Sequence, residues 1–397
     1  MDGTLEQKLT ATRAASRPEI LDLTEGEGKD ADRLKELFDA RAIQNIGDDY
    51  EEQLRELFAI NNPSLVYTLG FKEQAEVHLG ELRKKSPLWQ QGRWIFYPWL
   101  STLVHILIDE DFQKVRTARN KNLINAAEQD KFYNAVIGIG GLSVGNNVVL
   151  AIVQQGGGKH FRIADFDQLA LTNINRIRAG VQNLGLLKTE MTARQIYELN
   201  PYAKVEIFSD GLTKENLEKF FAGPPKLDVV IDELDSLGVK LLIREQAKKY
   251  GVPLVMAADN GDNAVVDVER YDQDPNLPFF QGRLGDVTYE ELISLDKFGI
   301  GKTITKHIGP ENITPRMQQS LLEMGKTIVS WPQLGGAAWL NGAAVAYCVR
   351  KIINDEPVES NRALISLDEK LIPEYNSPAA AKERADVAAS FRKMFGL

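Results

Sequence analysis

The stretch Ala135-Val-Ile-Gly-Ile-Gly-Gly-Leu-Ser-Val-Gly145 decides the fold of this chain. It starts with a short apolar run that is typical of a buried strand, and it ends where a helix-forming segment begins. The glycines between them, Gly138, Gly140 and Gly141, allow a helix to pack closely on the strand and let backbone N–H groups approach a phosphate. The stretch therefore predicts the first strand, turn and helix of a nucleotide-binding sheet.

Strands and helices are expected to alternate along the residues that follow. Apolar runs predict strands at 161–164, 205–208, 228–231, 254–257 and 264–271, and the segments between them predict helices at 188–199, 214–221 and 236–250. Such alternation produces parallel strands joined by right-handed crossovers. We therefore predict an α/β fold with a Rossmann-like, doubly wound, mostly parallel sheet and flanking helices. Its strand ends at Ile137, Ala164, Ile231 and Ala257 are expected to face one ligand crevice.

Three regions are expected along the chain. Residues 1–115 contain charged amphipathic segments and predict a helical N-terminal region. Residues 116–275 are expected to form the nucleotide-binding domain. Residues 276–397 are expected to add a crossover segment and closing helices to the same domain, with a long helix at about 337–354. Glycines and alanines on that helix would permit close approach to a neighbouring element or subunit.

Composition excludes several classes of protein. The net charge is −9 and the basic residues are dispersed, which argues against nucleic acid as a partner. The single cysteine excludes an intramolecular disulfide and a cysteine zinc knuckle, and the four histidines lack ligand spacing. No apolar stretch is long enough to cross a bilayer, and the charged N-terminus lacks the apolar core of a signal peptide. We expect a cytoplasmic protein with no membrane partner.

Polar side chains gather after the second expected strand. Asp165 follows it directly, where a carboxylate can accept both ribose hydroxyls of a nucleotide, and Asp167 comes next but one. Asn173 and Arg176 in the following loop, and Lys188 at a helix start, can converge above the phosphates. The chemistry of a dehydrogenase does not explain so many charged groups, whereas reaction at an α-phosphate requires cationic groups on the triphosphate.

A further carboxylate follows the strand expected at 228–231. This residue, Asp235, is the candidate ligand for Mg²⁺, an ion that makes pyrophosphate a better leaving group. Together with Arg176 and Lys188 on the triphosphate, it predicts a site that forms an adenylate from ATP.

These motifs resemble those of the ThiF/MoeB-type superfamily of ubiquitin-activating-like adenylyltransferases. Five of them occur in the order of that superfamily: Gly138 to Gly145, Asp165-Phe-Asp167, Asn173-Ile-Asn-Arg176, Gly185-Leu-Leu-Lys188 and Leu234-Asp235-Ser236. The resemblance covers residues 116–271 and, more weakly, 333–353. It implies ATP- and Mg²⁺-dependent adenylation of a carboxylate with release of pyrophosphate. The acceptor could be the C-terminus of a ubiquitin-like protein, a peptide or a small acid.

The resemblance also implies a homodimer. Members of the superfamily carry an arginine, upstream of the glycine turn, that enters the ATP site of the partner subunit, and Arg119 stands at that position. The implied catalytic residues are then Arg119, Arg176 and Lys188, with Asp165 on the ribose and Asp235 on Mg²⁺. A surface ion pair is the other interpretation of Arg119.

This sequence departs from the superfamily pattern at two points, and these departures limit the activity that the resemblance implies. Ser143 stands where the usual glycine pattern has its third glycine. No cysteine lies in the crossover region where thioester-forming relatives place their nucleophile, and Cys348 is expected on a core face of its helix. The turn from Gly141 to Gly145 and the run Asp235-Ser-Leu also resemble a bacterial subgroup in which this domain is sometimes fused to a nitroreductase-like domain. Activation of a carboxylate is therefore expected, and thioester transfer is not.

Three alternatives stay open. An NAD- or FAD-binding oxidoreductase would account for the glycine turn and Asp165 alone. A tRNA-modifying dehydratase of the same superfamily also adenylates a carboxylate, and a basic face from Arg83 to Lys85 would support it. A catalytically silent dimer would hold the nucleotide only as a structural ligand. Absorbance of a co-purified cofactor, titration with ATP and pyrophosphate exchange distinguish these functions.

Overall fold

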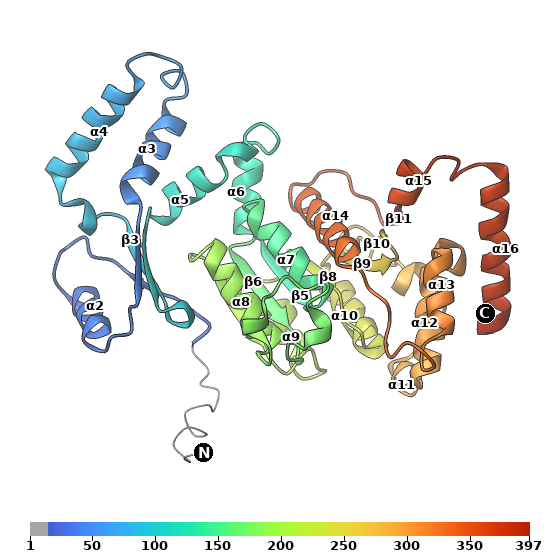
Figure 1. Cartoon of the computed structure of the whole chain (residues 1–397). Coiled ribbons are helices and arrows are strands. Elements are labelled where there is room, and N and C mark those ends of the chain that lie inside the picture. The colour runs from blue at the N-terminus through green and yellow to red at the C-terminus, as the bar shows by residue number, and fades with distance from the viewer. Residues whose placement is uncertain (1–14) are drawn as a thin grey trace. The chain divides into compact units, whose positions relative to one another are not determined.

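The computed structural model describes residues 15–397 (Figure 1). The contacts within the chain define two compact units, residues 1–126 with 193–202 and residues 127–192 with 203–397. The first unit extends beyond the predicted region 1–115, whose first 14 residues lie outside the described part. The second unit joins the glycine turn and the C-terminal segment in one body.

The first unit combines helices with a four-stranded sheet of order β1-β3-β4-β2. Its strands are β1 (Glu19–Leu21), β2 (Asn45–Asp48), β3 (Arg93–Tyr97) and β4 (Thr102–Ile106), and its helices include α2 (Lys29–Asp39), α3 (Tyr50–Asn61), α4 (Phe71–Lys85) and α5 (Asp109–Arg116). Strand β3 pairs antiparallel with β1 and β4, whereas β2 pairs parallel with β4. The expected helices are present, but the sheet was not predicted from the sequence.

Aromatic side chains explain this sheet. Trp94 and Phe96 are two residues apart on β3, so they share one face, where they pack with Leu37 of α2. His105 of β4 is stacked between the rings of Trp94 and Tyr50, with ring centroids 4.3 Å and 4.0 Å away. The aromatic residues near position 95 therefore build a strand and its core.

The second unit is built on a seven-stranded sheet of order β11-β10-β9-β8-β5-β6-β7. Its strands are β5 (Val136–Gly140), β6 (His160–Ala164), β7 (Lys204–Phe208), β8 (Val229–Asp232), β9 (Leu254–Asn260), β10 (Asn263–Glu269) and β11 (Asn361–Ile365). The strands from β9 to β7 in this order are parallel, and β10 and β11 add an antiparallel edge. The predicted doubly wound, mostly parallel sheet is confirmed. Strand β11 was not predicted, because it is a largely exposed edge strand without an apolar run.

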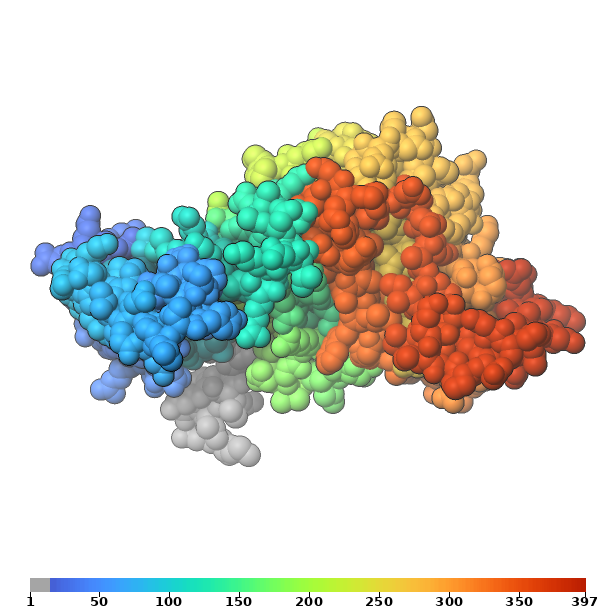
Figure 2. Space-filling view, turned by 90° about the horizontal axis from the view of Figure 1, so that it is seen from above, coloured from blue at the N-terminus to red at the C-terminus, as the bar shows by residue number. Residues whose placement is uncertain are grey.

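Helices connect and flank these strands. They are α6 (Ala126–Asn134), α7 (Val144–Gln154), α8 (Lys188–Leu199), α9 (Leu217–Ala222), α10 (Leu237–Tyr250), α11 (Tyr289–Ile293), α12 (Lys297–Ile308), α13 (Pro315–Leu322), α14 (Gly335–Ile353), α15 (Leu367–Leu371) and α16 (Pro378–Phe395). Figure 2 shows the C-terminal residues, in red, beside the orange segment of α12 and α13. Phe391 and Phe395 of α16 share a core there with Ile308 and Met317. Within residues 15–397, no helix has both the length and the apolar character needed to cross a membrane.

Helix α14 packs closely against α7, as the ribbon shows (Figure 1). A Cβ atom added at Gly342 of α14 would lie only 2.9 Å from the backbone carbonyl of Asn147 in α7. Helix α7 is itself almost entirely buried, because it lies between the sheet and α14. The small residues of α14 therefore permit close approach to a neighbouring helix, one of the two uses predicted for them.

Candidate functional site

The polar residues of the candidate site follow the carboxyl ends of the parallel strands. The register of the sheet pairs Gly140, the last residue of β5, with Ala164 of β6 and Asp232 of β8. The N–H of Gly141 donates to the Ala164 carbonyl and that of Glu233 donates to the Gly140 carbonyl, both at 2.8 Å. The loops that follow these three strands are therefore neighbours at one edge of the sheet, where ligands of such folds bind.

The glycine turn lies against the loop that follows β8. Gly141 has a φ of +87°, and an added Cβ would lie 2.1 Å from the carbonyl oxygen of Glu233. Close packing also explains glycine at positions 138 and 140. A Cβ added at Gly138 or Gly140 would lie 2.6 Å or 3.1 Å, respectively, from a core side chain. Helix α7 begins after Ser143 without a side-chain cap, so its first N–H groups can face an anion.

Asp165 follows β6, as predicted, and fixes the glycine turn. Its Oδ2 accepts a hydrogen bond from the N–H of Leu142 at 2.7 Å, and its Oδ1 accepts one from the N–H of Asp167 at 2.8 Å. Burial raises the pKa of Asp165, and the positive charge of Lys188 opposes that rise. Each carboxylate oxygen retains a second lone pair that a ribose hydroxyl could use.

Lys188 is the first residue of α8 and lies between two carboxylates. Its Nζ is 2.7 Å from Oδ2 of Asp167 and 3.8 Å from Oδ2 of Asp165. The lysine is only 5 % exposed, whereas the Asp167 side chain is 48 % exposed. The structure thus brings three of the predicted side chains together, with a buried ammonium group at their centre.

The loop from Asn173 to Arg176 aims the guanidinium at the glycine turn. Asn173 accepts a hydrogen bond through Oδ1 from the N–H of Ala170 at 3.0 Å, which fixes the start of the loop. Arg176 donates through Nε to Oγ of Ser143 at 3.0 Å and through Nη1 to Oδ1 of Asn175 at 3.0 Å. The serine at the position of the missing third glycine therefore contacts one of the predicted cationic residues.

Two carboxylates influence Arg176. Burial lowers the pKa of Arg176, and the charges of Asp259 and Asp235 oppose this. Asp259 lies near the end of β9, where it accepts hydrogen bonds from the amides of Gln333 and Asn341, and burial raises the pKa of Asp259 to about 6. Sequence reasoning missed Asp259, although an acidic residue soon after a predicted strand was a usable signal.

Asp235, the candidate metal ligand, is exposed in the loop between β8 and α10. Mg²⁺ at nucleotide sites commonly uses one or two carboxylates together with phosphate oxygens and water. A single exposed carboxylate near Arg176 fits that kind of site. Among the side chains of residues 15–397, no group of three or more His, Cys, Asp or Glu is placed to hold a metal ion.

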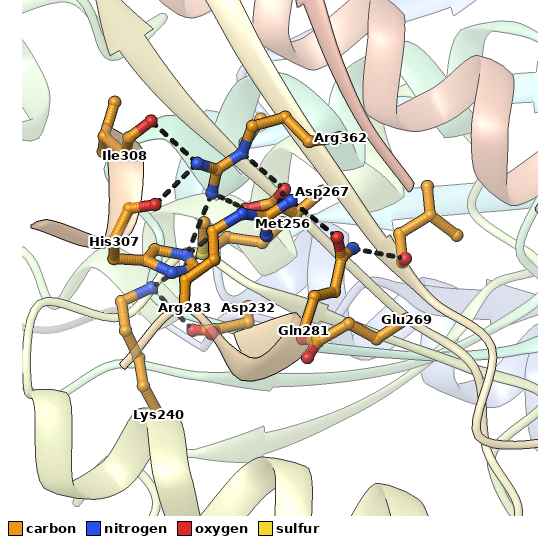
Figure 3. Close-up of polar contacts among 12 residues, drawn as sticks. Asp232, Lys240, Met256, Asp267, Glu269, Gln281, Arg283, His307, Ile308 and Arg362 are labelled. Carbon is orange, nitrogen blue, oxygen red and sulfur yellow. Dashed lines mark hydrogen bonds and ion pairs between the residues drawn. The ribbon is translucent and has the colours of Figure 1, made fainter. Parts of the chain in front are cut away.

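A buried set of charges that the sequence did not reveal begins at the end of β8 (Figure 3). Asp232 accepts hydrogen bonds from Nη1 of Arg244 at 2.6 Å and from Nζ of Lys240 at 3.0 Å. Arg244 also pairs with Glu269 of β10 at 2.8 Å. Burial alone would raise the pKa of Asp232, but Lys240 and Arg244 hold it below its ordinary value. These residues tie α10 to the sheet.

A second set of buried, paired charges lies at the antiparallel edge of the sheet (Figure 3). Asp267 of β10 is paired with Arg362 of β11 and lies 3.2 Å from Nε2 of His307 at the end of α12. The Arg362 guanidinium also donates to the His307 carbonyl at 2.6 Å. Burial lowers the pKa of His307 to about 4, although Asp267 opposes this. Because these charges are paired with one another, we assign them to holding α12 and β11 on the sheet.

Two predicted residues lie elsewhere. Arg119 belongs to the first unit, in a short turn at 118–120, and its side chain is exposed. Cys348 lies on α14 and is half-buried, not fully in the core as expected, and burial raises the pKa of its thiol. A raised pKa makes a thiol a poorer nucleophile at neutral pH.

Comparison with known proteins places this site in a family context. The model of the ThiF family matches residues 117–278. The uncharacterized protein MT1398 of Mycobacterium tuberculosis is 36 % identical over 326 residues, which are 82 % of this chain and 45 % of that protein. The tRNA threonylcarbamoyladenosine dehydratase of Escherichia coli is 31 % identical over 156 residues, 38 % of this chain and 56 % of the dehydratase. The sulfur carrier protein adenylyltransferase of Thermus thermophilus is 28 % identical over 124 residues, 31 % and 44 % of the two chains.

The family model matches the residues of the candidate site, and each of the three relatives is matched over only part of its length. The chain spans roughly half the length of these three proteins. The residues matched to the family model include the glycine turn, Asp165, Arg176, Lys188 and Asp235. The order of the strands and the grouping of these side chains at their carboxyl ends agree with that match. The chain therefore contains a ThiF family domain, which covers residues 117–278.

Proposed function

We propose that this protein uses ATP and Mg²⁺ to adenylate a carboxylate, with release of pyrophosphate. The grouping of Lys188 with Asp165 and Asp167, next to the turn that Arg176 contacts through Ser143, carries the proposal. Arg176, which contacts Ser143 at the start of α7, and Lys188, at the start of α8, are two cationic groups that suit a triphosphate. The ThiF family domain and the relative called a sulfur carrier protein adenylyltransferase support this assignment.

In the proposed reaction a carboxylate oxygen of the acceptor attacks the α-phosphorus of ATP. The bond to the pyrophosphate oxygen breaks, and an acyl adenylate forms. Arg176 offers a planar guanidinium that can bind two phosphate oxygens in a fixed geometry, and Lys188 offers a compact charge. Asp165 would accept the ribose hydroxyls. Lys188 would exchange part of its contact with the half-exposed Asp167 for a phosphate oxygen when ATP binds.

Asp235 would hold Mg²⁺ together with the phosphates. The ion would neutralise charge on the pyrophosphate leaving group. We further propose a homodimer in which Arg119 reaches the ATP site of the partner subunit, because the exposed side chain of Arg119 is available for such a contact. The cytoplasm remains the predicted location.

The acceptor is proposed by class only. A ubiquitin-like C-terminus, a peptide or a small acid would each present the carboxylate that the reaction needs. The relatives called tRNA threonylcarbamoyladenosine dehydratase make a carboxylate on a nucleoside a second candidate. We do not propose a thioester step, because Cys348 is half-buried and has a raised pKa.

Exchange of radioactive pyrophosphate into ATP tests the proposal. We expect exchange that depends on Mg²⁺ and on an added carboxylate, and we expect Arg176→Ala to reduce it at least tenfold. Lys326→Ala, a change at an exposed lysine in the same unit, is the control and should leave exchange intact. Failure of every acceptor class to support exchange, combined with absent ATP binding, would overturn the assignment.

A further inference from the structure

A path of three hydrogen bonds connects Asp259, near the end of β9, to Arg176. Oδ2 of Asp259 accepts from Nε2 of Gln333 at 2.9 Å. The backbone carbonyl of Gln333 accepts from Nδ2 of Asn175 at 2.8 Å. Oδ1 of Asn175 accepts from Nη1 of Arg176 at 3.0 Å. Three segments far apart in the sequence are thereby linked to one guanidinium.

The far end of this path is held firmly. Asp259 is 8 % exposed, and its other oxygen accepts a hydrogen bond from Nδ2 of Asn341, which is fully buried in α14. The charge of Arg176 also acts on the Asp259 carboxylate. A buried carboxylate that accepts two amide hydrogen bonds has one well-defined position. It can therefore serve as an anchor for the residues that lie between it and Arg176.

The close approach of α14 to the loop that contains Asn175 requires a glycine. Gly335 is the first residue of α14, and a Cβ added there would lie 2.4 Å from the carbonyl oxygen of Asn175. The next residue, Gly336, has no atom within 4 Å of its added Cβ. The start of α14 thus approaches the loop of Arg176 at one residue, and the neighbouring glycine offers a matched control.

Besides the bond to Asn175, Arg176 makes further hydrogen bonds, one of which runs from Nη1 to the Thr172 carbonyl at 3.1 Å. Its backbone carbonyl accepts from Nδ2 of Asn147 at 2.9 Å, which fixes the main chain. Its Nε donates to Ser143. An arginine that must meet phosphate oxygens in a fixed geometry gains from neighbours that restrict its rotamers, because less entropy is lost when the ligand binds.

We propose that Asp259 is a positioning residue for the triphosphate, acting through Gln333 and Asn175 to hold Arg176 in its phosphate-binding orientation. This inference rests on the proposed function, in which Arg176 binds the triphosphate. It adds a role for the segment just before α14, because the backbone of Gln333 is one link of the path. Asp259 itself touches no nucleotide in this arrangement.

Calorimetric titration of the full chain with ATP and with AMP tests the positioning role of Asp259. AMP lacks the β- and γ-phosphates of ATP. We expect Asp259→Asn, Gln333→Ala and Gly335→Ala each to raise the Kd for ATP at least fivefold. The Kd for AMP should change by less than twofold. Gly336→Ala should leave both values unchanged. Gln333→Ala and Gly335→Ala keep the test decisive if Asp259→Asn does not fold.

A double-mutant cycle separates positioning from general loosening of the fold. In an Arg176→Ala background, Gln333→Ala should have no further effect on ATP affinity, because the group that it positions is gone. Equal losses for ATP and AMP, or undiminished losses in the Arg176→Ala background, would overturn the inference. Wild-type ATP binding that Arg176→Ala weakens, with no effect of the Asp259 and Gln333 changes, would reject it while leaving the proposed function intact. Absence of ATP binding by the wild-type chain would instead reject the proposed function.

Discussion

Lys188 contacts Asp167 at two points: its Nζ lies 2.7 Å from Oδ2, and its backbone N–H donates to the Asp167 carbonyl at 2.9 Å. The backbone contact fixes the start of α8 beside the loop that follows β6, independently of the side-chain contact. The side chain can then turn toward a phosphate without moving the helix. The pair therefore keeps a cation ready at the edge of the sheet where the glycine turn lies.

Replacing Lys188 by Met should weaken ATP binding. The change removes a buried positive charge and leaves Asp165 and Asp167 to repel the triphosphate. We expect the Kd for ATP to rise at least tenfold, or about 1.4 kcal/mol. Calorimetric titration measures this. Lys326→Met serves as the control at an exposed site, and an unchanged Kd in Lys188→Met would contradict the proposed role of Lys188.

Replacing Arg244 by Met should destabilise the second unit. Arg244 is fully buried and pairs with Asp232 and Glu269, so its loss takes the arginine from two buried carboxylates and leaves Asp232 with Lys240 alone. Removal of one member of a buried charge network typically costs about 3 to 5 kcal/mol. Chemical denaturation measures the free energy of unfolding. Lys249→Met, on the exposed face of the same helix, should leave the free energy of unfolding nearly unchanged.

Protonation of His307 should make the protein sensitive to acid. Burial lowers the folded pKa of His307 to about 4, below the unfolded value of about 6.5. Between these values the unfolded chain binds a proton that the folded chain does not, so the free energy of unfolding falls as the pH falls from 6.5 to 4. We expect His307→Gln to reduce this loss by roughly 2 to 3 kcal/mol, at about 1.4 kcal/mol per pKa unit. Parallel stability curves for the two proteins would contradict the prediction.

Asp267 adds to the acid sensitivity in a lower range of pH. Pairing with His307 and Arg362 outweighs burial and lowers the pKa of Asp267. A carboxylate with a lowered folded pKa contributes stability above its unfolded value of about 4 and loses that contribution as the pH falls toward its folded pKa. Protonation of Asp267 therefore also lowers the free energy of unfolding as the pH falls, and it does so at lower pH than protonation of His307.

The parallel part of the fold could be predicted because its signals are local. Each buried strand is a short apolar run, and the glycines after β5 mark the turn into α7. The four strands of the first unit and β11 were missed for different reasons. The sheet of the first unit joins β3 and β4, which are close in sequence, to the distant strands β1 and β2, and β11 is an exposed edge strand whose pairing with β10 is long-range.

The residues of the candidate site also fall into those with local sequence signals and those that depend on long-range contacts. Asp165 and Lys188 could be placed because strand ends and helix starts position them. Asp259 and Gln333 could not be assigned to Arg176, since their connection depends on how α14 returns to the sheet. The buried charges of Arg244 and its neighbours could not be recognised either, because a charged residue in an amphipathic helix is usually exposed.

Cys348 should be dispensable for adenylation. Its thiol is half-buried on α14 and burial raises its pKa, so little thiolate is present at neutral pH. We expect Cys348→Ala to retain pyrophosphate exchange within about twofold of the wild-type rate, since no step of the proposed reaction uses a thiol. In the wild-type protein, the aromatic disulfide reagent DTNB should react with this cysteine at least tenfold more slowly in the folded chain than in urea. Fast labelling of the folded protein, together with loss of exchange in Cys348→Ala, would show instead that the thiol takes part in the reaction.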